Sequence, residues 1–203
     1  KQFKKEYIQR QIAANVSGVA ELSTMPKGYE DIKGIYSCGN YILNDEGVKK
    51  TAKTKDGDFI LVPICSHPLL IVERLRNIQD NCEKVVLAFC VGNRWEKVQV
   101  EREVIASNTK IIRLANSSID VTSETAKDIV KYLQCLMQKN INLIKVSHTV
   151  NRLGWKDGEF VPYSDKVKCD SITEFSGIYR AIESKGNYEL WRKHCLKLRE
   201  NIY

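Results

Sequence analysis

Hydrophobic and polar positions are patterned most clearly between residues 68 and 105, where three apolar-rich runs are separated by two turn signals. The first run covers 69–78 and the second 84–91, with the polar residues 79–81 between them. Gly92-Asn93, which tolerates positive φ and suits a tight hairpin, separates the second run from the third. Period-two alternation with β-branched residues indicates strands. The pattern predicts a three-stranded antiparallel meander that continues to Val104 and whose middle strand is buried on both faces.

Shorter patterns predict further strands before and after the meander. Residues 35–43 are typical of a strand pair or a bulged strand, 48–55 and 59–64 of two strands joined by a turn, and 110–114 of a short strand. Four lysines mark the 48–55 strand: Lys49, Lys50, Lys53 and Lys55. They suit a phosphate-contacting edge equally well as an edge protected against unwanted pairing.

Helical spacing of apolar residues appears in three places: residues 1–15, 124–139 and 187–200. In the 124–139 segment the apolar stripe is regular, with Thr122 or Ser123 as the expected N-cap and Asn140 at the carboxyl end. Residues 141–150 alternate with Ile144 and Val146 on the apolar side, and 153–161 predict a hairpin. The predicted fold is α+β, a mostly antiparallel sheet with helices packed on it.

Composition places the chain among ordinary globular domains. The chain has 203 residues, and we expect three parts. These are an N-terminal helix and linker over 1–34, a core domain over 35–165 and a C-terminal helical segment over 166–203. No apolar run is long enough to span a membrane. Seven cysteines without a C-x-x-C pair favour mostly buried thiols in a reducing, cytoplasmic setting. The chain opens on Lys1 rather than Met, which suggests a piece of a longer protein.

Sequence signatures of catalysis are few. There is no G-x-x-x-x-G-K-[ST] phosphate loop and no G-x-S-x-G elbow. Cys65-Ser66-His67 places a thiol near a base, but neighbouring residues on a strand point to opposite faces. Asp56 and Asp58 could hold a metal ion in a primase- or nuclease-like enzyme, but they flank Gly57 in an evident turn, which explains both residues without a metal.

A net charge of +7 with a pI near 9.0 is compatible with nucleic acid as a partner. Basic residues of the meander could form one surface, and tryptophan can stack on bases, although a hairpin tryptophan more often packs on the layer beneath it. The candidate DNA contacts are Arg74, Arg76, Arg94, Lys97, Arg152 and Trp155.

One segment resembles a known family. Residues 151–162 contain Arg152-Leu153-Gly154-Trp155 followed by Phe160-Val161-Pro162. This segment resembles a signature of the domain of unknown function that precedes the AAA+ ATPase in replicative helicases of phages, plasmids and other mobile elements. The likeness extends over roughly 60–200 and includes Gly186-Asn187 and Trp191.

The resemblance implies a role and no catalytic residues. It implies a non-catalytic accessory domain that binds DNA, single-stranded or forked, or that assembles an ATP-dependent DNA helicase. The implied partners are DNA, the AAA+ ATPase domain of the same chain and further copies in a homo-oligomeric ring, with no membrane. A docking domain within the parent helicase is the alternative. No cofactor is expected in these residues, whereas ATP and Mg²⁺ belong to the parent protein.

Overall fold

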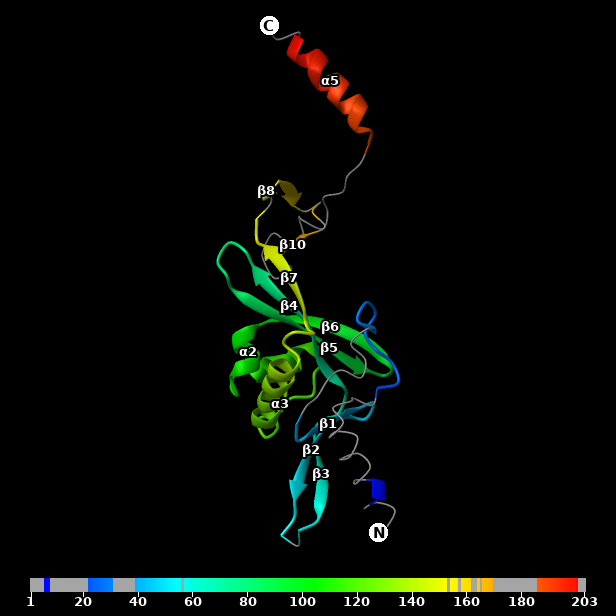
Figure 1. Cartoon of the computed structure of the whole chain (residues 1–203), viewed down its shortest axis with the longest axis vertical. Coiled ribbons are helices and arrows are strands. Elements are labelled where there is room, and N and C mark those ends of the chain that lie inside the picture. The colour runs from blue at the N-terminus through cyan, green and yellow to red at the C-terminus, as the bar shows by residue number, and fades with distance from the viewer. Residues whose placement is uncertain are drawn as a thin grey trace.

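The computed structural model describes residues 6–7, 22–30, 39–55, 57–152, 154–156, 158–161, 164, 166–169 and 186–200. Within these residues a five-stranded sheet, a three-stranded sheet and a small hairpin are accompanied by helices (Figure 1). The elements in chain order are β1 (Tyr41–Asn44), β2 (Gly47–Lys53), β3 (Phe59–Cys65), β4 (Leu69–Asn77), β5 (Glu83–Val91), β6 (Arg94–Glu101), α2 (Arg102–Ala106), η2 (Ile111–Ser117), α3 (Ala126–Lys139), β7 (Lys145–Val150), β8 (Gly154–Lys156), β9 (Glu159–Val161), β10 (Val167–Cys169) and α5 (Tyr188–Glu200).

The predicted meander is confirmed as β4, β5 and β6, which pair antiparallel in sequence order. Gly92 and Asn93 both have positive φ, 56° and 66°, so they form the tight turn between β5 and β6. The middle strand is buried on both faces, since Leu87 and Ala88 point to opposite sides and both have no exposed surface. The α+β fold class, mostly antiparallel sheet with helices, is confirmed.

Two strands from beyond the meander complete the larger sheet, whose order is β10-β7-β4-β5-β6. Both β7 and β10 join it in parallel pairs, so β4 has an antiparallel neighbour on one side and a parallel one on the other. The expected alternation in β7 is wrong: Val146 is 47% exposed, whereas Ser147 is buried. Ser147 is buried because its hydroxyl donates to the carboxylate of Glu73 on β4.

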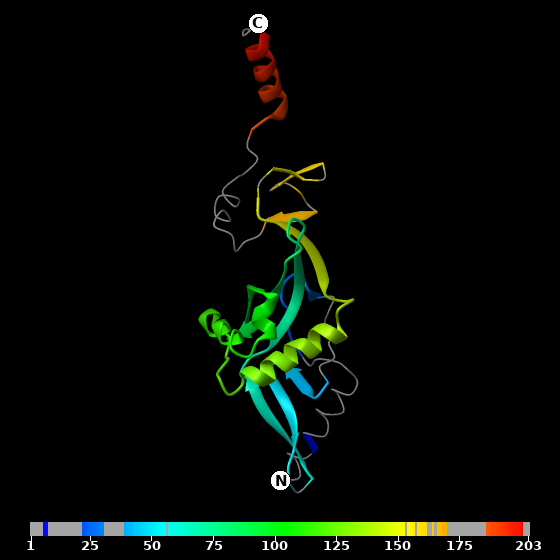
Figure 2. The same cartoon turned by 90° about the vertical axis from the view of Figure 1, so that its left-hand side faces the viewer.

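The smaller sheet has the order β1-β2-β3, which makes β2 its middle strand. Lys49 and Lys50 lie opposite residues of β1, so this part of β2 is not a free edge of the sheet. Both lysines also form ion pairs. Lys50 pairs with Asp128 of α3 at 2.8 Å, and Lys49 pairs with Glu46. Figure 2 shows the outer half of the β2–β3 hairpin projecting from the body of the molecule.

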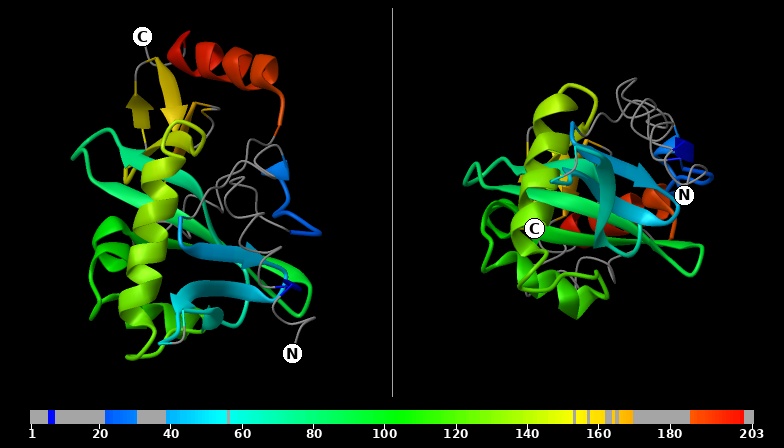
Figure 3. Two further views of the ribbon diagram at one scale, coloured as in Figure 1. Left: turned by 60° about the horizontal axis from the view of Figure 1, so that its bottom comes forward. Right: turned by 90° about the horizontal axis from the view of Figure 1, so that it is seen from below.

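Helix α3 packs along both sheets and follows the predicted apolar stripe (Figure 3). Ile129, Leu133 and Leu136 on that stripe have no exposed surface. The expected N-cap at Thr122 or Ser123 is wrong, because the helix begins after Thr125 and Thr122 instead hydrogen-bonds with the Thr125 side chain.

Two segments predicted as strand are helical. The third meander strand ends at Glu101, and Val104 lies in α2 together with Ile105, both buried. Successive side chains of a strand point to opposite faces of the sheet, whereas a helical turn can direct two successive side chains toward one neighbouring layer. Residues 111–117 form a 3₁₀ helix, because Ile111 and Leu114, three residues apart, fall on one side of it.

The cysteine expectation is mostly wrong. All cysteines among the described residues are free thiols, but Cys65 alone of them is buried. The predicted helix over 1–15 lies almost wholly outside the described residues. Residues 31–38 also lie outside them, so the predicted boundary between linker and core domain at residue 34 stays a prediction. The sheet extends to Cys169, beyond the expected end of the core domain at 165. No helix of the described residues is long and apolar enough to cross a membrane.

Candidate nucleic-acid interface

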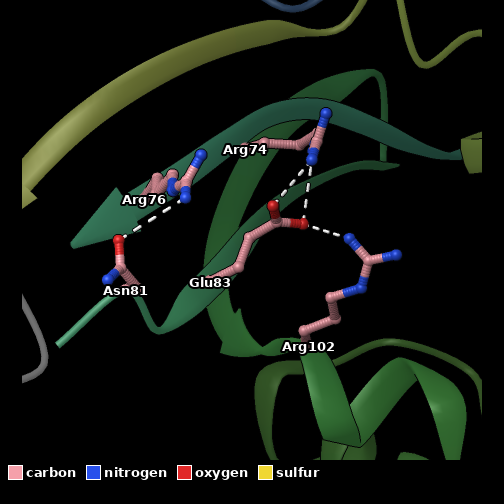
Figure 4. Close-up of polar contacts among 5 residues, drawn as sticks. All are labelled: Arg74, Arg76, Asn81, Glu83 and Arg102. Atoms are coloured by element: carbon pink, nitrogen blue, oxygen red, sulfur yellow. Dashed lines mark hydrogen bonds and ion pairs between the residues drawn. The ribbon is translucent and has the colours of Figure 1, made fainter. Parts of the chain in front are cut away.

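A cluster of arginines occupies the end of the five-stranded sheet where β4 turns into β5 (Figure 4). Arg74 of β4 donates to both carboxylate oxygens of Glu83, from Nε at 3.2 Å and from Nη2 at 2.7 Å. Arg102, the first residue of α2, donates to the same carboxylate from the other side. Figure 4 shows Arg76 beside this group, donating at 3.4 Å to Asn81 in the turn.

The cluster keeps an excess of positive charge. Burial raises the pKa of Glu83, but the hydrogen bonds from Arg74 and Arg102 outweigh it and hold that pKa below its ordinary value. Glu83 is therefore a carboxylate at neutral pH, and it offsets one of the three guanidinium charges around it. Arg76 and Arg102 are exposed, so the remaining positive charge faces solvent.

The neighbouring strand adds exposed side chains to the same face. In the pairing of β4 with β7, Arg76 lies opposite His148 and Arg74 lies opposite Val146. His148 and Val146 are both exposed. This end of the sheet thus presents basic groups next to an apolar one.

The β8–β9 hairpin begins at the same end of the sheet. The amide of Ile78 donates to the carbonyl of Thr149 at 3.0 Å, and the amide of Asn151 donates to the side chain of Gln79 at 3.4 Å. These contacts tie the residues just before the hairpin to the β4–β5 turn. Arg152, which follows directly, is exposed.

Trp155 is the most exposed large hydrophobic residue described, with 77% of its surface accessible. It packs edge-on against Phe160 across the hairpin, with ring centroids 5.5 Å apart. Trp95 is different: it packs against the core, and its indole N–H donates to the hydroxyl of Thr24 at 3.0 Å. The expectation that a hairpin tryptophan packs on the layer beneath describes Trp95 and not Trp155.

The structure brings together four of the six predicted contacts and separates the other two. Arg74 and Arg76 lie at the β4–β5 end of the sheet, and the chain segment with Arg152 and Trp155 leaves the sheet at that same end. Arg94 pairs with Val91 at the opposite end of β5.

Lys97 lies on the opposite face, because its partner Ala88 points away from the Arg74 side. Its Nζ donates to the carbonyl of Lys27 at 3.0 Å and lies 4.5 Å from the centre of the Tyr29 ring. The single basic surface expected around the meander is not formed.

Sequence reasoning missed Arg102 and His148. On a strand continuing to Val104, Arg102 would fall on the apolar face with Val98 and Val100, opposite Glu101 and Glu103. A charged residue on that apolar face was the signal that the strand ends before Val104. His148 has no local signal, since only the parallel pairing of β7 with β4 places it beside Arg76.

The thiol–base pair does not form an activated nucleophile. His67 is buried, and its Nε2 accepts the backbone N–H of Asp120 at 3.3 Å. Burial raises the pKa of the Cys65 thiol to about 11, so the thiol stays protonated. Asp56 lies outside the described residues, and Asp58 is exposed. Among the described residues, no three His, Cys, Asp or Glu side chains are grouped to hold a metal ion.

Comparison with known proteins gives one matching family and similar solved structures. Residues 41–203 match the family model described as a domain of unknown function, DUF927. No curated protein matches the chain. A solved structure described as the active helicase Cch of SCCmec type IV superposes with a TM-score of 0.46 and 15% sequence identity. The superposition covers 78% of this chain and 30% of that one, so the chain spans under a third of that protein's length.

Proposed function

The chain belongs to the DUF927 family of domains of unknown function, and from that premise we propose that it is a non-catalytic accessory domain of a cytoplasmic mobile-element or phage replicative helicase. Its role is to contact DNA through the end of the sheet that carries Arg76, Arg152 and Trp155. The helicase assignment rests on the resemblance of the 151–162 segment. The DNA contact rests on the surface described above.

The observation that carries the DNA contact is the exposure of Trp155 in the hairpin that follows β7 at the arginine-cluster end of the sheet. A tryptophan that is 77% exposed offers an aromatic face, and stacking of a base on such a face contributes about 1–3 kcal/mol. Arg76, Arg102 and Arg152 lie at the same end of the sheet, where their charges can bind phosphates. Stacking on unpaired bases together with phosphate contacts is typical of single-strand binding.

Fluorescence anisotropy of a labelled oligo-dT with this chain tests the proposal across a salt series. We expect affinity to fall steeply with salt, with a logarithmic slope of about −0.7 for each phosphate contact. Trp155→Ala should weaken binding by about 5- to 150-fold, the equivalent of about 1–3 kcal/mol. Trp191→Ala, which removes a tryptophan 61% exposed on α5, is the matched control.

Charge reversal locates the phosphate contacts. Arg76→Glu should lower both the affinity and the salt slope, whereas Arg94→Glu, at the far end of β5, should change neither. Equal effects of the two substitutions would contradict this location. Absence of binding at about 50 mM salt would contradict DNA contact by these residues altogether.

A second candidate function, docking to the ATPase domain of the parent helicase, is favoured by α5. Every residue of this helix is exposed, and Leu190 and Trp191 are 68% and 61% accessible. An isolated ATPase domain that binds this chain, and loses binding with Leu190→Glu but not with Trp155→Ala, would support docking through α5.

A further inference from the structure

Strand β3 presents an apolar edge in the hairpin at the end of the molecule opposite α5 (Figure 1). It is an outer strand of the three-stranded sheet, and no strand among the described residues pairs with its outer edge. Phe59, Ile60 and Val62 are 52%, 43% and 39% exposed. A long, uncharged, apolar edge strand is a template for pairing with another chain.

The hairpin register shows which backbone groups of β3 face outward. The amide of Thr54 donates to the carbonyl of Asp58 at 2.8 Å, which makes this a hydrogen-bonded pair. Hydrogen-bonded and non-hydrogen-bonded pairs alternate in an antiparallel ladder. In the observed pairing of β2 and β3, the backbone N–H and C=O groups of Ile60 and Val62 therefore point toward β2. The backbone groups of Phe59, Leu61 and Pro63 point outward, away from β2. Pro63, which has no N–H, occupies a position where β2 does not need one.

We propose that β3 binds β3 of a second copy of this chain, antiparallel, about a two-fold axis at Leu61. This register pairs Leu61 with Leu61, Phe59 with Pro63 and Ile60 with Val62. Each cross-strand pair is apolar, and no charged side chain lies on the paired segment. The outward N–H groups of Leu61 and Phe59 meet carbonyls of Leu61 and Pro63, so the missing proline N–H is tolerated.

The chemistry of the edge favours a second copy over other partners. Binding of nucleic acid needs positive charge on the protein, and β3 carries none. Asp58, just before the strand, adds a negative charge at the tip of the hairpin. An acidic protein would be drawn to the lysines of β2 rather than to β3. The strand is complementary to itself because it is uniformly apolar and neutral.

The paired area sets the strength of the dimer. A standard stable interface covers about 800 Å² per partner. One short strand pair with three largely exposed apolar side chains on each copy falls below that area. The dimer should therefore be weak and concentration-dependent, and insensitive to salt because no ion pair holds it.

Sedimentation velocity of the 203-residue chain without nucleic acid tests the dimer, from about 5 to 500 µM, the range in which a weak association is seen. We expect the sedimentation coefficient to rise with concentration in low and high salt alike. Val62→Lys should abolish the rise. Val91→Lys is the matched control, because Val91 is 44% exposed on β5, away from this edge. A monomer over the whole range, or a dimer unaffected by Val62→Lys in a variant with native circular dichroism, would overturn the proposal.

A cysteine scan tests the register. Residues at the two-fold axis face each other in a hydrogen-bonded pair about 5.5 Å apart at Cα, which suits a disulfide. In a background where the exposed Cys82 and Cys195 are replaced by Ser, Leu61→Cys should cross-link two chains under copper–phenanthroline oxidation. Phe59→Cys should not, because residue 59 faces residue 63 of the other copy. Equal cross-linking of both variants would overturn the two-fold at Leu61. Since DNA is not present in either experiment, the outcome is independent of the proposed DNA contact.

Discussion

Replacement of the buried Glu73 should destabilise the fold more than that of any exposed carboxylate. Its side chain is 5% exposed and accepts three hydrogen bonds: from the Tyr29 hydroxyl at 2.6 Å, from the Ser147 hydroxyl, and from Lys168 Nζ at 2.5 Å. These donors come from the 22–30 segment, β7 and β10. One carboxylate on β4 therefore ties three separate stretches of chain to the sheet.

The magnitude follows from those three contacts. A hydrogen bond to a charged group contributes about 1.5–3 kcal/mol, and a buried donor left without an acceptor costs about as much. Lys168 is 49% exposed, so solvent screening limits its ion pair to about 1 kcal/mol or less. Removing the desolvation cost of the carboxylate offsets part of the loss. We expect Glu73→Ala to lower the free energy of unfolding by about 3 kcal/mol, and Glu73→Gln, which keeps an acceptor, by about 1–2 kcal/mol.

Urea denaturation followed by circular dichroism measures these differences. Glu103→Ala is the matched control, because Glu103 also pairs with a lysine, Lys110 at 2.6 Å, but on the surface. Its unfolding midpoint should equal that of the wild type. If Glu73→Ala and Glu103→Ala unfold at the same urea concentration, the carboxylate does not hold the three segments together.

The pH dependence has a definite sign. Burial raises the pKa of Glu73, but hydrogen bonds from Lys168, Ser147 and Tyr29 outweigh it and hold the pKa below its ordinary value. The stabilisation is thus fully present above the unfolded pKa of about 4.3 and is lost as pH falls through the folded pKa. The gap in stability between wild type and Glu73→Gln should narrow from pH 7 to pH 3. A gap that stays constant with pH would show that charge on Glu73 contributes nothing.

Two further predictions concern the junction between the sheets. Gly47→Ala should lower the free energy of unfolding, measured by urea denaturation, by about 3–5 kcal/mol. The reason is that φ is +118° and the new Cβ would lie 2.3 Å from the carbonyl oxygen of Cys65. Gly57→Ala, at φ +86° in open space, should lower it by only about 1–2 kcal/mol. Burial lowers the pKa of His67 despite the charge of Asp120, so stability should fall as pH drops below the unfolded pKa of about 6.5 and level off below the folded pKa. His67→Gln should remove that fall, and its persistence would assign it to another group.

Local pattern by itself determined the elements whose signals are short-range. The meander, its Gly92-Asn93 turn, the 154–161 hairpin and the helix over 126–139 follow from periodicity and turn chemistry. Prediction from the local pattern failed where the burial of a residue depends on a partner far away in the chain. Val104 and Ile111 carry strand-like patterns but lie in helices, because two successive or three-spaced apolar residues meet the same core.

The tertiary structure alone decided which strands became neighbours, and with them the candidate interface. Parallel insertion of β7 beside β4 puts His148 next to Arg76, and it starts the segment with Arg152 and Trp155 at the end of the sheet that holds the arginine cluster. The alternation of side chains along β6 turns Lys97 to the other face. No local signal specifies that insertion, because it depends on contacts between residues far apart in the chain, such as Ser147 and Lys168 with Glu73. Residue type predicted which side chains could bind DNA, whereas long-range strand pairing determined which of them share a surface.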